Sequence, residues 1–436
     1  MLTQTLVWFM NSLMMGRLGK DELAAGALVN TSYYLLVVTC FGFMNAIGVC
    51  IGQANGALDK IAVRNFFQQG SYLVFFISFP IIALLWNLPH FFQLLHQPHK
   101  LIELSAQYFH GIAWGTIGFL GYFLIKEFFS NLETPAVAMY IALLGLGTTI
   151  FLDYGFVHGA FGLPAWGMFG IGLANAIAQW LMFFGILIYA YLEKSMHFYI
   201  YKGWDKIHWK TLRHLLYLGF PMSVTYFFEA GLFNVATIIM GWIGINNLAA
   251  HQITLQCTEV IFVSFLAIAQ TASIRIANSI GQNHISDIKK IVVIIVSLCF
   301  ILAIPVAIVF WLYPAEIAEL FIGIRTSANQ SVYKLTYTFL HIAAFFIFLD
   351  GLQVIGNNIL RSMKDAYVPL VLNLGTYWII GIGSAWLLGL YFQWQGAGVW
   401  IGLTLGVATS MLTIWARFFY LYRQAKLTSV FVPAVI

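Results

Sequence analysis

Four carboxylic acids lie inside long apolar stretches of this sequence, where an ionisable side chain needs an explanation. Glu229 is embedded in Tyr-Phe-Phe-Glu-Ala-Gly-Leu-Phe, and Asp350 in Phe-Ile-Phe-Leu-Asp-Gly-Leu-Gln. Neither has another charged residue within three positions, so a local ion pair does not account for them. Glu259 and Asp153 occupy two further apolar stretches. If these stretches cross a membrane, each acid costs about 2.5–3.5 kcal/mol on insertion scales and is a candidate functional residue.

Two buried carboxylates brought together have the chemistry of ion exchange. Such a pair can take up a proton or Na⁺ near neutral pH and release it again. We expect Glu229 and Asp350 to form the pair, and Glu259 is a third candidate for the same cluster. We interpret Asp153, near the end of its stretch, as a structural or capping residue. For each acid the alternative is a purely structural hydrogen bond to a neighbouring helix.

The elements that must hold these acids are transmembrane helices. Of the 436 residues, 61% are hydrophobic and 8% are charged, whereas a soluble domain has about 25% charged residues. A spanning helix needs roughly 20 apolar residues, and the uncharged stretches 291–312 and 368–392 supply that length. We therefore predict an all-α integral membrane protein. Its expected spans, about twelve, lie at 2–16, 24–52, 65–88, 101–128, 136–157, 167–192, 214–242, 247–274, 288–313, 332–360, 367–392 and 397–422.

The placement of Lys and Arg predicts the orientation of the chain. With an even number of spans both termini lie on one side, and the loops of that side with the tail hold 16 of the 21 Lys and Arg residues. Because such loops stay in the cytoplasm, we expect cytoplasmic N and C termini. The net charge of +5 has the same origin and does not indicate a nucleic-acid partner. The four cysteines lie within apolar spans and show no spacing typical of a metal site or disulfide framework.

The chain contains an internal repeat. Residues 15–25 and 240–250 match at seven of eleven positions, counting Leu and Ile as equal, at an offset of 240 − 15 = 225. Six predicted spans accompany each copy, which indicates two parallel six-helix bundles related by a pseudo-two-fold axis along the membrane normal. The alternative is chance similarity between Gly- and Ala-rich helices. The predicted organisation is an N-terminal lobe at 1–193, a cytoplasmic linker at 194–212, a C-terminal lobe at 213–424 and a cytoplasmic tail at 425–436.

The two halves differ in charge and in their starting points. Glu229, Glu259 and Asp350 all lie in the second half, and the position equivalent to Glu229 is Gln4, which cannot ionise. The sequence therefore places the ion chemistry in the C-terminal lobe. The second half begins about twenty residues before its copy of the repeat motif, a lead-in that the first half lacks. We expect the first helix to be truncated, or short and tilted.

Six motifs occur in a characteristic order along the chain: Met15-Gly-Arg-Leu-Gly with Leu-Ala-Ala at 23–25, Leu218-Gly-Phe-Pro, Phe228-Glu-Ala with Phe233, Ala249-Ala-His-Gln252, Ser273-Ile-Arg275, and Gln353-Val-Ile-Gly with Leu360-Arg361. In this order and spacing they resemble the multidrug and toxic compound extrusion (MATE) family, in its bacterial NorM-like branch. The resemblance implies two six-helix bundles around a central cavity in a bacterial inner (plasma) membrane. It also implies export of organic cations and other xenobiotics in exchange for Na⁺ or H⁺. The family's C-lobe acids match Glu229 and Asp350, which would hold Na⁺ if Na⁺ is used.

The sequence departs from the family pattern at three positions. Asn11 stands where the family carries an acid, so it cannot cycle a proton, although its carbonyl can still contact Na⁺ or a ligand. Phe346 stands where NorM-like members carry a tyrosine one turn before the acid. Glu259 falls where that branch carries a small polar residue, and we expect it to supply an oxygen that Phe346 lacks.

Aromatic side chains make up 17% of the sequence, and their ring faces attract organic cations. We single out Tyr33, Tyr226 and Phe228 as cavity candidates; lipid contact is the alternative for most aromatic residues. His251, Asn11 and Phe346 complete the candidate cavity set, and a bond to a neighbouring backbone group is the alternative for His251. Arg361 lies at a predicted cytoplasmic helix end, where we expect it to snorkel to the interface.

These observations together predict a secondary active exporter that works by alternating access. We expect no cofactor beyond Na⁺ or H⁺ as coupling ion, and a monomer whose partners are the bilayer and small organic cations. The first alternative is a lipid-linked oligosaccharide flippase of the same superfamily, which would need several Arg or Lys residues for pyrophosphate; none lies mid-span in the N-terminal half. A membrane-embedded enzyme would need clustered His, Asp or Ser residues, and a channel would need repeated polar loops. Neither pattern is found, so we expect no enzymatic activity.

Overall fold

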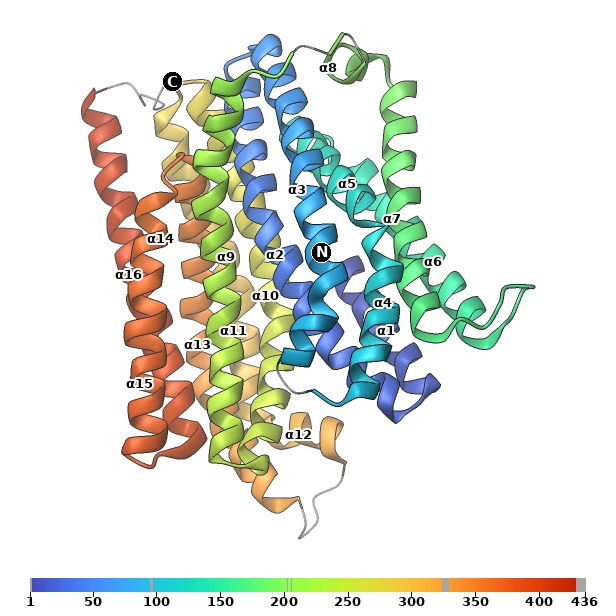
Figure 1. Cartoon of the computed structure of the whole chain (residues 1–436). Helices are drawn as coiled ribbons and strands as arrows, with labels where there is room; N and C mark the ends of the chain where they lie inside the picture. Colours follow the sequence, from blue (N-terminus) through green and yellow to red (C-terminus); the bar gives the residue numbers. More distant parts are fainter. Residues whose placement is uncertain (1, 95–96, 202, 205, 324–328, 429–436) are drawn as a thin grey trace. The chain divides into compact units, whose positions relative to one another are not determined.

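The computed structural model describes residues 2–94, 97–201, 203–204, 206–323 and 329–428. Across these residues the chain forms helices and no strand (Figure 1). Ten of the described helices are long and apolar enough to cross a membrane, and the bent pair α4 (His99–Ala113) and α5 (Thr116–Asn131), which meet at 51°, makes an eleventh span. The remaining predicted span is α1 (Leu2–Leu18), with 17 residues. The prediction of an all-α, multi-pass membrane protein is confirmed.

The chain divides into two compact units, Met1–Gly219 and Phe220–Ile436. The boundary between them falls inside α9 (Trp209–Ile243), between Gly219 and Phe220 and one residue before Pro221. The first turns of α9 therefore belong with the first unit, together with the predicted linker. Besides α1, α4 and α5, the first unit contains α2 (Lys20–Gly56), α3 (Lys60–Leu94), α6 (Ala136–His158), α7 (Gly167–Leu192), η1 (Lys194–Met196) and α8 (His197–Ile200).

Helix α7 organises the first unit, where it packs against α4, α5 and α6. Two glycines allow its closest approach to α4. A Cβ atom on Gly172 would lie 2.3 Å from the Tyr108 carbonyl oxygen, and one on Gly111 would lie 2.7 Å from the Phe169 carbonyl oxygen. Small residues at such crossings let membrane helices pack backbone against backbone. The crossing fixes Tyr108 on α4 relative to the polar residues of α7.

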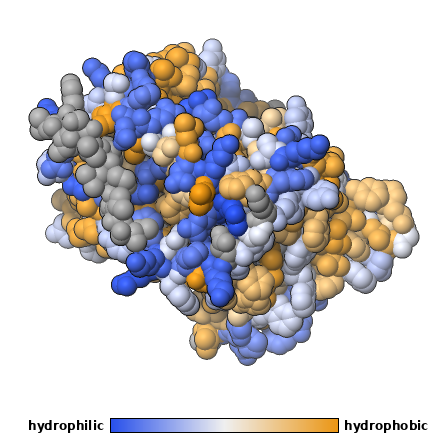
Figure 2. All heavy atoms as spheres, turned by 90° about the horizontal axis from the view of Figure 1, so that it is seen from above, coloured by the Kyte–Doolittle hydropathy of each residue, from blue (hydrophilic) through white to orange (hydrophobic). Residues whose placement is uncertain are grey.

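The predicted linker is held against α3 by two buried glutamines. Gln68 Nε2 donates to the Gly203 carbonyl at 3.0 Å. Gln69 Nε2 donates to the Lys206 carbonyl at 3.2 Å, and its Oε1 accepts from the His208 amide at 2.9 Å. The segment thus packs as part of the first unit. Figure 2 shows hydrophilic residues gathered on the end of the molecule that carries α8.

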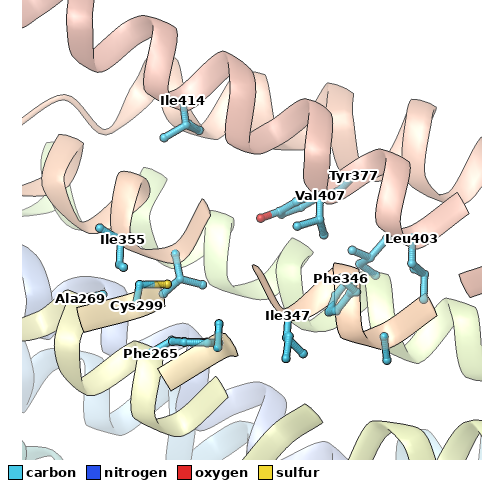
Figure 3. Packing of buried hydrophobic residues seen from close by; sticks show 14 of the residues in the cluster. Phe265, Ala269, Cys299, Phe346, Ile347, Ile355, Tyr377, Leu403, Val407 and Ile414 are labelled. Atoms are coloured by element: carbon cyan, nitrogen blue, oxygen red, sulfur yellow. The ribbon is translucent and has the colours of Figure 1, made fainter. Parts of the chain in front are cut away.

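Helix α13 (Gln330–Ser362) is the central helix of the second unit, where it packs against α10, α11 and α16. Figure 3 shows its Phe346, Ile347 and Ile355 among buried side chains of these neighbours. Next to Asp350, a Cβ atom on Gly351 would lie 2.8 Å from the sulfur of Cys299, so α11 passes close to the acid. The other helices of this unit are α10 (Ile245–Gly281), α11 (Ile285–Leu312), α12 (Pro314–Ile322), α14 (Tyr367–Leu374), α15 (Gly383–Trp386) and α16 (Gln395–Thr428).

The predicted span 367–392 is one continuous segment, but much of it is π-helical. Helix α14 continues into the π-helical segments η2 (Gly375–Ile382) and η3 (Leu387–Tyr391), with α15 between them. Helix α16 packs so closely on this segment that a Cβ atom on Gly402 would lie 2.3 Å from the Ala385 amide nitrogen. π-Helical turns are rare and frequently occur at functional sites. The predicted tail 425–436 begins inside α16, and residues 429–436 lie outside the described residues.

Candidate ion-binding site

The structure brings Glu229 and Asp350 together inside the second unit. Glu229 lies on α9 and is half-buried, while Asp350 lies on α13 and is 6% exposed. The two carboxyl groups are close enough for their charges to interact. This is the arrangement that the sequence predicted for an exchangeable cation. Neither acid has a salt-bridge partner within 4 Å among the described residues.

The π-helical segment adds a buried hydroxyl to the acid pair. Tyr377 on η2 is 1% exposed, and its phenol group interacts electrostatically with both Glu229 and Asp350. The Gln353 amide, one turn after Asp350 on α13, donates a hydrogen bond to the Tyr377 hydroxyl oxygen. Figure 3 shows Tyr377 lying among apolar side chains of the core. Sequence reasoning missed this hydroxyl, because nothing in the sequence distinguished it from the other aromatic residues.

A hydrogen-bond network connects successive turns of α13 near the acid pair. It runs from Gln353 to Tyr377, then to Ser410 on α16, which Tyr377 contacts through a hydrogen bond. Ser410 Oγ donates to Asn373 Oδ1 at 2.7 Å, and Asn373 Nδ2 donates to Asn357 Oδ1 at 3.1 Å. Because Gln353 and Asn357 are four residues apart, the network begins and ends on one face of α13. It ties α13, α14, η2 and α16 together beside the acids.

Arg361 is a member of this site, contrary to the expectation that it snorkels to the interface. It lies on the last turn of α13 and is only 3% exposed. Its guanidinium carbon lies 4.1 Å from the centre of the Tyr226 ring, and its charge interacts with Glu229. Position at a helix end favoured an interfacial arginine, but α9 covers this end with Tyr226.

The donor set of the site suits one monovalent cation or a proton. Hard cations bind oxygen ligands, and the Glu229 and Asp350 carboxylates with the Tyr377 hydroxyl supply such oxygens. Among the described residues, no group of three or more His, Cys, Asp or Glu side chains is arranged so that it could hold a metal ion. With both acids ionised, Arg361 leaves a net charge of −2 + 1 = −1. That charge matches Na⁺ or H⁺ better than a divalent ion.

Glu259 does not join the acid pair, so the expectation that it supplies an oxygen there is not met. It lies on α10 with an exposed side chain, next to the buried Thr258. The reason is its position on the helix: one residue further along α10 than Thr258, it faces out of the unit.

Two of the predicted aromatic candidates lie beside the acids on α9. Tyr226 is buried under the Arg361 guanidinium, so its ring already holds a cation of the protein itself. Phe228 is half-buried and meets the ring of Trp378 edge to face, with 5.5 Å between ring centres. Phe228 therefore keeps part of its ring available, whereas Tyr226 does not.

Phe346 and His251 lie in the core of the second unit. Phe346 is 1% exposed and packs edge to face on Trp400 at 5.7 Å between ring centres. His251 also contacts the Trp400 ring, and its Nε2 lies 3.1 Å from the Thr237 hydroxyl. The expectation that these two side chains line a cavity is not supported by this packing. The partner of His251 is a side-chain hydroxyl on α9 and not a backbone group.

The first unit contains a second buried polar cluster, centred on Asn11. Asn11 on α1 and Asn175 on α7 exchange two amide hydrogen bonds of 3.3 and 3.2 Å, and Tyr108 also hydrogen-bonds with Asn11. Asp153 on α6 is fully buried and interacts electrostatically with Tyr108. Neither of its carboxylate oxygens has a hydrogen-bond partner among the described residues. The interpretation of Asp153 as a capping residue is therefore wrong, because a cap would bond the backbone.

Tyr33, the third predicted aromatic candidate, belongs to the same unit. It is 7% exposed, and its hydroxyl accepts a hydrogen bond from Gln179 Nε2 at 3.2 Å. Gln179 lies one turn after Asn175 on α7. The Tyr33 side chain also interacts electrostatically with Tyr108. Tyr33 is thus an extension of the Asn11 cluster.

Comparison with known proteins agrees with this architecture. The chain matches the MatE family model over residues 1–155 and 221–387. It is 30% identical over 420 residues to the "Probable multidrug resistance protein NorM" of Synechocystis sp., which covers 96% of this chain and 91% of the relative. A protein of the same name from Bradyrhizobium diazoefficiens is 32% identical, with 94% and 88% covered.

Solved structures show the same fold at low sequence identity. The outward-facing conformation of a multidrug resistance MATE family transporter of the MOP superfamily is 17% identical, with a TM-score of 0.86 over 98% of this chain and 93% of that one. The eukaryotic MATE transporter AtDTX14 is 18% identical, with a TM-score of 0.84 over 98% and 95%.

Proposed function

This chain belongs to the MatE family, and from that premise we propose that it is a multidrug exporter driven by Na⁺ or H⁺ through the Glu229–Asp350 pair. Its relatives at about 30% identity carry the name "Probable multidrug resistance protein NorM". The observation that supports the ion coupling is that two interacting carboxyl groups, one half-buried and one buried, lie within one helical unit. Intramembrane acids of this kind mark ion pathways in transporters.

The proposed mechanism is alternating access between an outward-open and an inward-open state. The coupling ion enters from outside, where it is concentrated, and neutralises one charge of the acid pair. An organic cation or other xenobiotic enters from the cytoplasm or the inner leaflet. A ligand shifts the equilibrium between the two states only through its different affinities for them. The ion and the substrate must therefore drive opposite changes between the outward-open and the inward-open state.

Different residues of the second unit have different roles in binding the coupling ion. Glu229 and Asp350 supply the negative charge that holds Na⁺ or carries the proton. The Tyr377 hydroxyl offers a further oxygen, and Gln353 fixes its position by donating to it. The buried network from Tyr377 to Asn357 keeps α13 and η2 in register, so that the oxygens stay at one geometry.

The first unit supplies a second place for a cation. Asp153 is buried without a hydrogen-bond donor in the described part of the chain, and it interacts with Tyr108 of the Asn11 cluster. Asn11 cannot carry a proton itself, but its hydrogen bonds to Tyr108 and Asn175 connect Tyr108, the neighbour of the acid, to α7. We include Asp153 in the proposed ion chemistry for this reason.

The competing functions find less support. A flippase for a pyrophosphate-linked lipid would need free cations inside the first unit, yet Lys126 on α5 is paired with Glu127 at 3.0 Å. A membrane-embedded enzyme finds no support among the relatives at about 30% identity, which are named probable multidrug resistance proteins. The bacterial inner membrane, the cytoplasmic termini and the monomeric state remain part of the proposal.

The test is dye efflux from vesicles under separately imposed Na⁺ and pH gradients. We expect one of the two gradients to drive efflux in the wild type. Glu229→Gln and Asp350→Asn should reduce gradient-driven efflux to the background without preventing folding. Glu259→Gln is the matched control, because it removes an acid that lies outside the pair, and it should retain efflux. Wild-type efflux in both acid-pair variants would refute the proposal.

A further inference from the structure

Arg361 is a buried cation without an ion-pair partner among the described residues. Its side chain makes no salt bridge there, and its Nη2 has no hydrogen-bond partner. The acid nearest to it in sequence, Asp365, is already paired with Arg417 at 2.7 Å. Removing a charge from water without pairing it is unfavourable by several kcal/mol. Such an arginine needs an electrostatic partner at longer range.

That partner is the acid pair. The Arg361 charge acts on Glu229 and on Tyr377, and the Glu229 charge acts in turn on Asp350. The three charges therefore follow one another in the order Arg361, Glu229, Asp350. Side chains on a helix tilt toward its N-terminus, so Arg361 on the last turn of α13 points back along the helix toward the acids.

The Tyr226 ring fixes the position of this charge. The guanidinium carbon lies 4.1 Å from the ring centre, a distance at which arginine stacks on an aromatic face. Tyr226 and Glu229 are three residues apart on α9, so both occupy one face of that helix. The stacked guanidinium thus lies against the face of α9 that carries Glu229, and its charge interacts with the Glu229 carboxylate.

The α13 face between Asp350 and Arg361 is polar throughout. Asp350, Gln353, Asn357 and Arg361 follow one another at intervals of three, four and four residues, which places them on a single face. Gln353 Oε1, Asn357 Nδ2 and Arg361 Nη2 have no hydrogen-bond partner among the described residues. Unsatisfied buried polar groups of this kind are usually satisfied by ordered water. Polar side chains, and not apolar ones, therefore line the face of α13 between the Arg361 charge and the Asp350 carboxylate.

We propose that Arg361 is a tethered cation of the ion site, which balances Glu229 after the coupling ion has left and weakens the binding of the next ion. This inference rests on the proposed coupling role of the acid pair. With Arg361 present, the ionised site carries one net negative charge and binds one monovalent cation reversibly. Without it, the site carries two, so it holds the cation more tightly and releases it more slowly.

The experiment compares Arg361→Gln, Arg361→Lys and wild type in two assays on the full-length protein. The first measures gradient-driven dye efflux as a function of Na⁺ or H⁺ concentration, using the ion that drives the wild type. The second measures binding of that ion directly, as the rise in Tm of the purified protein when Na⁺ replaces choline at constant ionic strength, or when H⁺ is varied. Arg417→Gln is the matched control, because it removes an arginine that is paired with Asp365.

We expect Arg361→Gln to lower the half-saturating ion concentration about tenfold in both assays, the order of effect that one unit charge near a binding site has at the effective dielectric constant of a protein. Its maximal efflux rate should fall at the same time, because release becomes slow. Arg361→Lys keeps the charge and should stay within about twofold of wild type, and Arg417→Gln should leave the half-saturating concentration unchanged. An unchanged or raised half-saturating concentration in Arg361→Gln overturns the proposal, as does an equal shift in Arg361→Lys.

Two further outcomes are informative. Should Arg361→Gln fail to fold, Tyr226→Ala removes the stacking ring but no charge, and it should shift the half-saturating concentration in the same direction by a smaller factor. No shift in Tyr226→Ala would then overturn the proposal.

If neither gradient drives efflux in the wild type, the proposed function itself fails. If a gradient drives efflux and the arginine variant binds its ion as wild type does, only the inference about Arg361 fails.

Discussion

The contact between α4 and α7 allows a prediction whose size follows from the structure. A Cβ atom on Gly172 would lie 2.3 Å from the backbone oxygen of Tyr108, whereas real Cβ contacts essentially never fall below 3.0 Å. The two helices would have to separate by at least 3.0 − 2.3 = 0.7 Å at this point. The obstacle is backbone and not a flexible side chain, so rotamer changes cannot relieve it.

Gly172→Ala should therefore destabilise the protein by about 1–3 kcal/mol, the usual effect of overpacking a well-packed core. The same separation would move Tyr108 relative to Asn175, one turn along α7, and loosen the Asn11 cluster. Thermal unfolding in detergent measures the first effect as a lower Tm. Gradient-driven efflux measures the second, and we expect the ion dependence to change in parallel.

The control is Gly147→Ala on α6, where a Cβ atom would meet nothing within 4 Å. Alanine is favoured over glycine in a helix by about 1 kcal/mol, so this variant should be at least as stable as the wild type. A Gly172→Ala protein that unfolds at the wild-type temperature would contradict the close backbone contact. Equal losses in both variants would indicate a general effect of the substitution instead.

Two further predictions concern the first unit. Asp153→Asn should fold normally, because its carboxylate oxygens accept no hydrogen bond from the described residues, and it should change the half-saturating ion concentration for efflux; an unaltered ion dependence would restrict the ion chemistry to the second unit. Gln69→Leu removes both bonds that hold the linker at Lys206 and His208. The two hydrogen bonds together contribute about 1–2 kcal/mol to holding the linker, so their loss should raise the rate of trypsin cleavage at Lys206 and Lys210 some 5–30-fold. A wild-type cleavage rate would show that the linker is held by other contacts.

The spans and the acid pair could be predicted from sequence because both are local properties. A stretch of apolar residues long enough to cross a bilayer forms a helix whatever surrounds it. An isolated acid within such a stretch, as at Glu229 and Asp350, is conspicuous before any neighbour is known. The repeat then placed both acids in one half of the chain.

The remaining residues of the site could not be found in this way, because their burial depends on other helices. Arg361 and Asp153 both lie near the ends of their spans, where sequence position favours an interface or a cap. Only the structure shows that Tyr226 covers the arginine and that the Asn11 cluster lies beside the aspartate. Tyr377 stands in a π-helical segment, and nothing in its apolar surroundings predicted that departure from α-helix.

The structure also changes the meaning of the asymmetry between the halves. By sequence the acids of interest lie in the second half, and Asn11 replaces an acid in the first. In the structure each unit has its own buried acidic cluster. The first contains Asp153 with neutral amide and hydroxyl neighbours, for a charge of −1 when ionised. The second contains Glu229 and Asp350 with Arg361, for −2 + 1 = −1.

One net negative charge in each cluster is the common feature of the two units, although different residues provide it. A cluster with this charge becomes neutral when it binds one monovalent cation. A neutral cluster is buried at a much lower free-energy cost than a charged one. The extra acid of the second unit would break this condition without Arg361. In the proposed mechanism the arginine therefore lets two carboxylates share a site that releases its ion, and removing it should tighten ion binding and slow turnover together.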